Sequence, residues 1–425
     1  MSDLHDLCKF PFRPITSKSL DELKYYLKAG IPATYTIEEA YNFTNGIEEG
    51  GATSTTTPLH LIATHVPKDL SEAEMDIVND MVRTLFEYGA GWCLTDVNND
   101  TPGCILIKRE LKDTPLYDQI VDAGVRAELL LRKVSEFDME VLSDDEIPDL
   151  VGEGESSVSV EEEAGKNDGK SGNNDVLENA TDEVIEESQD PSFNQKAYLE
   201  SKLEYKNDAL VTENGKDGVM MSWETDLMKI GSESLFATAD DPENVNILNI
   251  GFGMGIIDTM ISAKTPTKHY ICEAHPDVLA KMKEDGWYSK PNVVILEGRW
   301  QDSLNNVLSS GQVYFDGIYY DTFSEHYEDM LELFDFVVGL LKPSGVFSFF
   351  NGLGADRQVI YEVYKKLVEI DLGNYGMKLQ FKEVTVPKET MAKGNEENGS
   401  VWDDIRRPYW SCPVYYHPEA RFHDI

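Results

Sequence analysis

The stretch Gly251-Phe252-Gly253-Met254-Gly255 decides the fold of this chain of 425 residues. It follows an apolar run at 245–250 that is typical of a buried strand, and it precedes a run with helical character at 256–263. The order strand, glycine turn, helix is how an open parallel sheet approaches a nucleotide. Glycines in such a turn let the backbone come close to a ligand and adopt angles that side chains forbid. The stretch therefore predicts a nucleotide-like ligand at the edge of a parallel sheet.

The spacing of these glycines separates two families of nucleotide-binding folds. A dinucleotide fingerprint requires a further glycine at a position where this chain has Ile256. The form Gly-x-Gly-x-Gly is instead found in methyltransferases that hold S-adenosylmethionine. The turn therefore favours a methyltransferase over a dehydrogenase.

Strands and helices alternate through the second half of the chain. This alternation predicts an α/β fold with a doubly wound sheet, and two final strands without a helix between them predict an antiparallel edge. The expected strands are 246–250, 269–272, 293–296, 317–320, 346–350, 379–386 and 413–416, and the expected helices include 276–285, 327–341 and 356–370.

The overall composition limits the kinds of partner. The chain has a formal net charge of −41 and 41% hydrophobic residues, so it can bury sizeable cores beneath an acidic surface. Such a surface repels a phosphate backbone and attracts a basic protein, so we expect no direct nucleic-acid ligand. Five scattered cysteines without a C-x-x-C pattern indicate a reducing compartment, without a zinc site or a disulfide framework. Neither a secretory signal nor a run of about 20 apolar residues is present, so we expect a cytoplasmic or nuclear protein without a membrane span.

The composition changes sharply near Ser143. Residues 144–190 contain 17 acidic residues against 2 lysines, a net charge of −15. A stretch so poor in apolar residues cannot bury enough surface to offset the entropy of ordering, so we expect a disordered acidic linker at 143–191. Recruitment of a basic partner by this stretch is the alternative interpretation.

The segment before this linker has a helical and repetitive pattern. The sequence Thr-Pro-Leu-His-Leu-Ile-Ala at 57–63 resembles the opening of an ankyrin repeat, with Ile62 in place of the usual alanine. A second Thr-Pro pair begins at Thr101, 44 residues later, whereas a standard repeat has about 33 residues. We therefore expect an ankyrin-repeat-like helical domain at 1–142, in which His60 has a structural role.

Acidic and aromatic side chains follow the expected strands. Glu273 ends the second strand, 22 residues after Gly251, where a carboxylate accepts hydrogen bonds from ribose hydroxyls; a solvated strand end is the alternative. Trp300 either offers an aromatic face to adenine or packs in the core. Asp321 follows the fourth strand and faces the crevice between the first and fourth strands, unless it caps a helix. His275 we expect to pack or to cap a helix.

Five short motifs together resemble guanidinoacetate methyltransferase over most of residues 192–425. They are Trp-Glu-Thr at 223–225, Gly-Phe-Gly-Met-Gly at 251–255, Glu-Gly-x-Trp-x-Asp at 297–302, Phe-Asp-Gly-Ile-x-Tyr-Asp-Thr at 315–322 and Leu-Leu-Lys-Pro-x-Gly-Val at 340–346. A guanidinoacetate enzyme does not carry an ankyrin-like domain and an acidic linker. The whole arrangement, including the segment 198–205, resembles a fungal family of protein arginine methyltransferases that act on the internal δ nitrogen.

This resemblance implies a Rossmann-like class I methyltransferase domain at 192–425 with S-adenosylmethionine as its cofactor. It also implies a monomer whose partner is a basic protein substrate, a large-subunit ribosomal protein. The residues that it places around the cofactor are Tyr205, Met228, Gly251, Phe252, Gly253, Met254, Gly255, Ile256, Glu273, Ala274, His275, Trp300, Gln301 and Asp321.

Glu224 and Asp321 are the expected catalytic residues. A guanidinium group stays protonated in proteins, and it must be held near a sulfonium, which is also a cation. Carboxylates bind the planar guanidinium, offset the charge repulsion and can accept the proton lost on methylation. One carboxylate would clamp the terminal nitrogens and the other would orient the attacking nitrogen, and the sequence does not decide which is the base. Methylation of a free guanidino metabolite and a non-enzymatic scaffold stay open as alternative functions.

Overall fold

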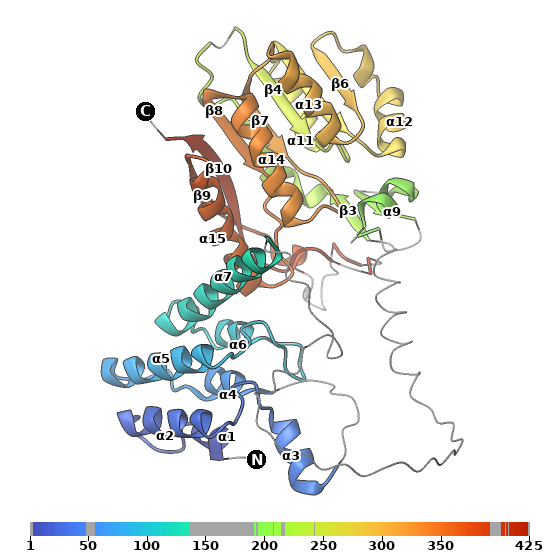
Figure 1. The fold of residues 1–425 in the computed structure, drawn as a ribbon. Coiled ribbons are helices and arrows are strands. Elements are labelled where there is room, and N and C mark those ends of the chain that lie inside the picture. The colour runs from blue at the N-terminus through green and yellow to red at the C-terminus, as the bar shows by residue number, and fades with distance from the viewer. Residues whose placement is uncertain are drawn as a thin grey trace, which may run out of the picture.

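The computed structural model describes residues 3–47, 56–136, 191–192, 194–206, 208–213, 217–241, 243–391, 401–403, 405–406 and 408–423. The linker expected at 143–191 lies almost wholly outside these residues. A stack of helices precedes an α/β domain along the chain, and the two pack against each other (Figure 1). Within the described ranges, no helix is long and apolar enough to cross a membrane.

The N-terminal part is a stack of paired helices. Its helices are α1 (Asp3–Leu7), α2 (Ser17–Lys28), α3 (Ile37–Asn45), α4 (Pro58–His65), α5 (Glu72–Glu87), α6 (Pro102–Lys108) and α7 (Pro115–Glu136). Helices α1, α4 and α6 contact one another in one row, and α2, α5 and α7 form a second row beside it. The chain therefore repeats a unit of two helices here, while its relation to ankyrin repeats stays a prediction.

Threonines begin two helices of this stack. Thr57 and Thr101 each accept a hydrogen bond from the backbone N–H three residues on, and a proline follows each in the first turn. The Nδ1 atom of His60 accepts from the Thr57 backbone at 3.2 Å, and its Nε2 donates to the Leu94 carbonyl oxygen at 3.0 Å. His60 thus ties its own helix to the next turn of the stack, which confirms its structural role.

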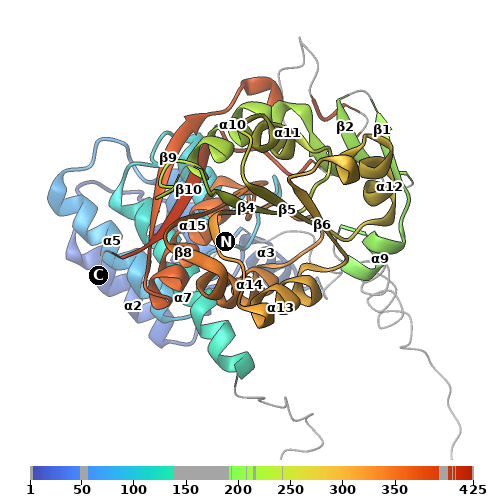
Figure 2. The same ribbon diagram turned by 90° about the horizontal axis from the view of Figure 1, so that it is seen from above.

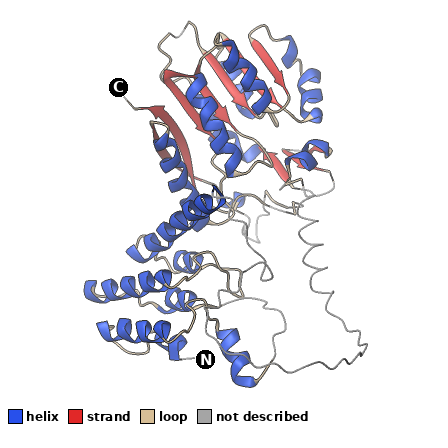
Figure 3. Ribbon diagram, viewed as in Figure 1, coloured by secondary structure: helices blue, strands red, loops and turns tan. Residues whose placement is uncertain are grey.

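The C-terminal part is a seven-stranded sheet with helices on both faces (Figures 2 and 3). Its strands are β4 (Asn246–Ile250), β5 (Lys268–Glu273), β6 (Val293–Glu297), β7 (Phe315–Tyr320), β8 (Leu341–Phe349), β9 (Met377–Thr385) and β10 (Val414–Phe422). Its helices are α9 (Gln195–Glu200), α10 (Thr225–Ser234), α11 (Ile256–Ala263), α12 (Pro276–Glu284), α13 (Trp300–Ser310), α14 (Tyr327–Leu340) and α15 (Gln358–Asn374). A separate small sheet comprises β1 (Leu203–Lys206), β2 (Ala209–Thr212) and β3 (Gly218–Met221).

The strand order of the large sheet is β6-β5-β4-β7-β8-β10-β9. The first five strands are parallel, and β10 runs antiparallel to both β8 and β9. Helices α10 and α11 lie on one face, and α13 and α14 lie on the other (Figure 2). This arrangement confirms the doubly wound sheet with an antiparallel edge, and it places the strand-order reversal between β4 and β7.

Three features differ from the sequence prediction. The small antiparallel sheet of β1, β2 and β3 was not expected, because strands of four residues show too little alternation to be recognised. The segment 221–228, which by itself has the pattern of an amphipathic helix start, becomes helical only at Thr225, since Met221 ends β3 and a 3₁₀ turn follows it. Strand β8 begins at Leu341 and not at Val346, because Leu341 already pairs with Phe315 of β7.

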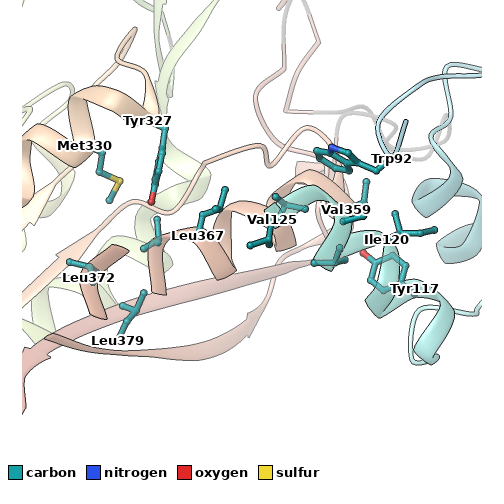
Figure 4. Close-up of a cluster of buried hydrophobic side chains, with 14 of the residues drawn as sticks. Trp92, Tyr117, Ile120, Val125, Tyr327, Met330, Val359, Leu367, Leu372 and Leu379 are labelled. Carbon is teal, nitrogen blue, oxygen red and sulfur yellow. The ribbon is translucent and has the colours of Figure 1, made fainter. Parts of the chain in front are cut away.

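One hydrophobic core extends from the helical stack into the α/β domain (Figure 4). Trp92 and Val125 of the stack lie in the same buried cluster as Val359 of α15. Two glycines permit the close approach: a Cβ on Gly103 would lie 2.6 Å from Val359, and a Cβ on Gly124 would lie 2.6 Å from another valine of α15. The two parts of the chain are therefore joined by close packing and not by loose docking.

Candidate active site

The glycine turn lines an open cavity at the carboxyl ends of β4, β5 and β7. Gly251 and Gly253 have φ angles of 93° and 54°, in the left-handed region that favours glycine. A Cβ on Gly251 would lie only 1.8 Å from the backbone oxygen of Asp321. Phe252 packs instead against Trp287, with 5.2 Å between the ring centroids. The turn therefore presents bare backbone to the cavity.

Glu273 holds the glycine turn through its carboxylate. Its Oε2 accepts hydrogen bonds from the backbone N–H groups of Phe252 at 2.8 Å and Gly253 at 3.4 Å. Its Oε1 accepts from the backbone of Ala274 at 2.8 Å and His275 at 2.7 Å. Burial raises the pKa of Glu273, and these donors oppose that rise because they stabilise the ionised form. The carboxylate thus joins the turn to the end of β5, at the wall of the cavity.

The expected cofactor residues divide into those that line the cavity and those that support it. The lining residues are Gly251, Gly253, Glu273, Ala274, Trp300 and Asp321, while Tyr205, Met228, Phe252, Met254, Gly255, Ile256, His275 and Gln301 lie outside the lining. Tyr205 donates a hydrogen bond to the Gly253 carbonyl oxygen at 3.1 Å. Met228 is fully buried in a hydrophobic cluster, and His275 caps α12 by accepting from the Asp277 backbone.

Glu325 accepts hydrogen bonds from several segments that line the cavity or lie beside it. Its four donors are Trp300 Nε1 at 2.8 Å, Tyr320 Oη at 2.5 Å, Thr322 Oγ1 at 2.6 Å and Gln195 Nε2 at 2.5 Å. These donors come from α13, β7, the loop after β7 and α9, so one carboxylate joins four segments. Glu325 was not predicted as a site residue, although it stands four residues after Asp321 in the same loop.

Helix α9 covers one side of the cavity. Tyr198 lies buried in the lining, with its ring 4.8 Å from the His275 ring and 4.9 Å from the Phe323 ring. Only the family resemblance of the segment 198–205 drew attention to Tyr198, since nothing in its chemistry indicates a ligand.

A second cavity, of about 290 Å³, adjoins the first. The residues that line both cavities are Val219, Asp321, Thr322, Phe323 and Glu325. The second cavity adds Glu224, Tyr409 and the rings of Phe349 and Phe350. Its described lining contains three carboxylates and neither lysine nor arginine, so its chemistry suits a cation.

Glu224 and Asp321 both face this second cavity. Burial and the negative charge of Asp321 raise the pKa of Glu224 well above its ordinary value, while the hydrogen bond from the Tyr409 hydroxyl acts in the opposite direction. Burial raises the pKa of Asp321 to about 7, and the charge of Asp258 adds to the rise. The Oδ2 atom of Asp321 is buried without a hydrogen-bond partner among the described residues. Two carboxyl groups therefore lie in the second cavity, and a bound cation would stabilise the ionised form of each.

Aromatic rings pack around Tyr409, the hydrogen-bond partner of Glu224. The rings of Trp402 and Tyr409 lie 4.7 Å apart, and those of Trp223 and Trp410 lie 5.8 Å apart. The sequence analysis missed Tyr409, because its segment has no helix or strand periodicity and its one signal is a density of aromatic residues. Asp321 is not a helix cap, since His326 takes that role at the start of α14.

The doubly wound sheet and the glycine-lined cavity define a methyltransferase of Rossmann-like fold. A sequence model of the guanidinoacetate N-methyltransferase family matches residues 189–397. The chain is 63% identical over 435 residues to protein arginine N-methyltransferase 2 of Debaryomyces hansenii, which covers 100% of both chains. It is 49% identical to the protein of the same name from Saccharomyces cerevisiae, over 99% of this chain and 100% of that protein. The chain therefore belongs to the protein arginine N-methyltransferase 2 family.

The expected cofactor of this methyltransferase is S-adenosylmethionine. The first cavity fits such a group, because the backbone of Gly251 and Gly253, the buried carboxylate of Glu273 and the indole of Trp300 line it together. The O-methyltransferase TomG from Streptomyces achromogenes, solved in complex with SAM, is 15% identical with a TM-score of 0.33, over 48% of this chain and 82% of that chain. This structural similarity is too low to support an inference of its own.

Proposed function

We propose that this protein methylates the internal δ nitrogen of an arginine side chain in a basic protein, a large-subunit ribosomal protein. The observation that carries the proposal is the acidic second cavity, which shares Asp321 with the cavity of the glycine turn. A guanidinium group keeps its positive charge at neutral pH, so it is the arginine group that such a cavity would bind. We also propose that the protein acts as a monomer in the cytoplasm and nucleus.

The glycine turn, Glu273 and Gln301 would hold the cofactor. A ribose hydroxyl would replace the longest hydrogen bond at Glu273, the one from Gly253 at 3.4 Å. Gln301 lies just behind the lining residue Trp300, and its side-chain amide is buried without a hydrogen-bond partner among the described residues, so we expect it to turn toward the polar edge of adenine when the cofactor binds. When bound, the cofactor supplies a methyl group on a sulfonium, and the carbon–sulfur bond breaks as the bond from nitrogen to carbon forms.

Glu224 would clamp the guanidinium, and Asp321 would orient the attacking nitrogen. Glu224 is only 2% exposed, and the Tyr409 hydroxyl fixes its carboxylate. The two terminal nitrogens of the guanidinium would each donate a charge-assisted hydrogen bond to Glu224. The internal nitrogen would then face Asp321, which lines both cavities. Asp321 would accept the proton displaced from that nitrogen and release it to solvent. The arginine keeps its charge, so the reaction releases one proton in each turnover.

The second cavity disfavours guanidinoacetate as the substrate. Guanidinoacetate carries a carboxylate close to its guanidinium, and the described lining offers three carboxylates but no lysine or arginine to pair with it. An arginine within a polypeptide lacks that negative charge. The net charge of −41 further favours a basic protein partner, because opposite charges accelerate association.

The position of the methyl group tests this proposal directly. A basic large-subunit ribosomal protein and free guanidinoacetate are incubated separately with the enzyme and labelled cofactor. The ribosomal protein is expected to become methylated, and tandem mass spectrometry should show that the terminal guanidino nitrogens leave as unmethylated fragments. A methyl group on a terminal nitrogen would contradict the δ assignment, and labelling of guanidinoacetate alone would overturn the protein substrate.

The activity is expected to depend on the ionisation of Asp321. Below its pKa of about 7 the carboxyl group is neutral and binds a guanidinium weakly, so activity is lost as the pH falls. We expect kcat/KM to decline about tenfold per pH unit on this acid side and to level off above it. Asp321→Asn should shift the acid limb of its residual activity to lower pH, because Glu224 still titrates there and its pKa falls without the charge of Asp321. Asp302→Asn, at an exposed position on α13, should keep the native profile. A profile of the native enzyme that is flat across neutral pH would exclude Asp321 as the titrating group.

A further inference from the structure

The loop that carries Asp321 is held at both of its ends. At its start, the backbone N–H of Asp321 donates to the Ile250 carbonyl oxygen at 2.9 Å. At its end, α14 begins with Tyr327, whose buried hydroxyl donates to Asp371 Oδ2 at 2.6 Å. Between these points Ser324 has a φ angle of 61°, which L residues rarely adopt. Backbone strain of this kind persists only where the surrounding structure fixes it.

A residue of the helical stack completes the anchor at Tyr327. Arg132 on α7 donates to the same Asp371 Oδ2 atom at 2.8 Å, and its guanidinium lies 4.8 Å from the centre of the Tyr327 ring. The side chains of Arg132 and Asp371 are 21% and 11% exposed, so water screens this pair little. The triad Arg132–Asp371–Tyr327 thus joins α7, α15 and α14, and it crosses the junction between the two parts of the chain.

We propose that Arg132 is a positioning residue for Asp321, so that the helical stack fixes the geometry of the catalytic loop in addition to any part in binding the substrate. This inference rests on the proposed function of Asp321. Loss of Arg132 would leave the Asp371 carboxylate without its cation. Tyr327 would then be held less firmly, and the strained loop before it could relax. None of the three triad residues lines the cavity of the glycine turn, so cofactor binding should change little. A small displacement of a positioned group is enough to slow a reaction that depends on alignment.

Turnover by the full chain tests this role. Arg132→Met and Tyr327→Phe are each expected to lower kcat about tenfold, while KM for the protein substrate and cofactor affinity stay within about twofold. A short arginine peptide should show the same loss, since its turnover does not depend on capture by the helical stack. The double variant should lose no more than one single variant, because both act through Asp371. Arg132→Lys keeps the cation and should lose less than Arg132→Met.

Lys366→Met provides the matched control. Lys366 on α15 forms a second ion pair across the same junction, with Asp122 of α7 at 2.8 Å, but both side chains are about half exposed. This variant weakens the junction without touching the triad, so its kcat should equal that of the native enzyme. Three results would overturn the inference: an unchanged kcat in Arg132→Met, a loss confined to KM for the protein, or an equal loss in Lys366→Met.

Hydrogen–deuterium exchange gives a second readout that needs no activity. Backbone amides at 321–327 are expected to exchange about tenfold faster in Arg132→Met than in the native chain or in Lys366→Met. Equal exchange in all three proteins would mean that Arg132 does not hold the loop. If the native chain transfers no methyl group to arginine but the exchange difference is present, the proposed function fails and the anchoring of the loop stands.

Discussion

Replacing Glu224 by glutamine is expected to lower kcat by about 10²- to 10⁴-fold, the range spanned by a single acid–base or charge-pairing group. The amide keeps the shape of the carboxylate but removes the charge that would balance a guanidinium beside a sulfonium. Glu224 lines the second cavity and not the first, so the cofactor should bind with nearly native affinity. Single-turnover rates and calorimetric titration with S-adenosylhomocysteine separate the two effects.

Asp226→Asn is the control for this substitution. Asp226 stands two residues further along, on the exposed side of α10, and makes the same change of charge outside both cavities. Its turnover should equal that of the native enzyme within about twofold. Native turnover in Glu224→Gln would remove Glu224 from the mechanism and leave Asp321 as the sole candidate acid–base group.

Gly251→Ala is expected to weaken cofactor binding by about 100-fold or more, which corresponds to about 2.8 kcal/mol. The added Cβ would lie 1.8 Å from the Asp321 backbone oxygen, so either the turn or the catalytic loop must move. The φ angle of 93° adds a conformational cost for any L residue. Titration calorimetry with S-adenosylmethionine measures the loss, and the thermal unfolding midpoint shows whether the variant is folded.

Gly286→Ala isolates the conformational part of that cost. Gly286 also has a positive φ angle, 78°, but a Cβ there would meet no atom within 4 Å. This variant should lose about 1 kcal/mol of stability and bind the cofactor as the native protein does. Native affinity in Gly251→Ala would mean that the glycine turn does not form the cofactor site.

Local pattern was enough to predict the centre of the sheet. The glycine turn and the runs on either side of it predicted a strand at 246–250 and a helix at 256–263, and these are the bounds of β4 and α11. The position of β10 between β8 and β9 could not be predicted in the same way, because the order of strands depends on pairing between distant segments. The same reason explains why β10 extends to Phe422, well beyond the predicted end of the strand.

The candidate site likewise contains residues that local sequence pattern could predict and residues that it could not. Glu273 and Asp321 could be predicted because both follow strands, and the ends of parallel strands meet at one edge of the sheet. Tyr409 and Arg132 could not be predicted, since their partners Glu224 and Asp371 lie 185 and 239 residues away along the chain. No local periodicity reports contacts over such separations, and Arg132 even belongs to the other part of the chain.

The three carboxylates that line the second cavity also bear on how the product leaves. In the proposed reaction, methylation of the internal nitrogen removes one N–H donor but not the positive charge, so Glu224 and Asp321 would attract the modified side chain as they attract the unmodified one. Release of the methylated side chain would then depend on the lost hydrogen bond. It would also depend on the volume of the added methyl group in the second cavity, which Tyr409 and Phe350 help to line. The same carboxylates that admit the side chain would thus slow its exit, so single-turnover and steady-state rates together are needed to separate methyl transfer from product release.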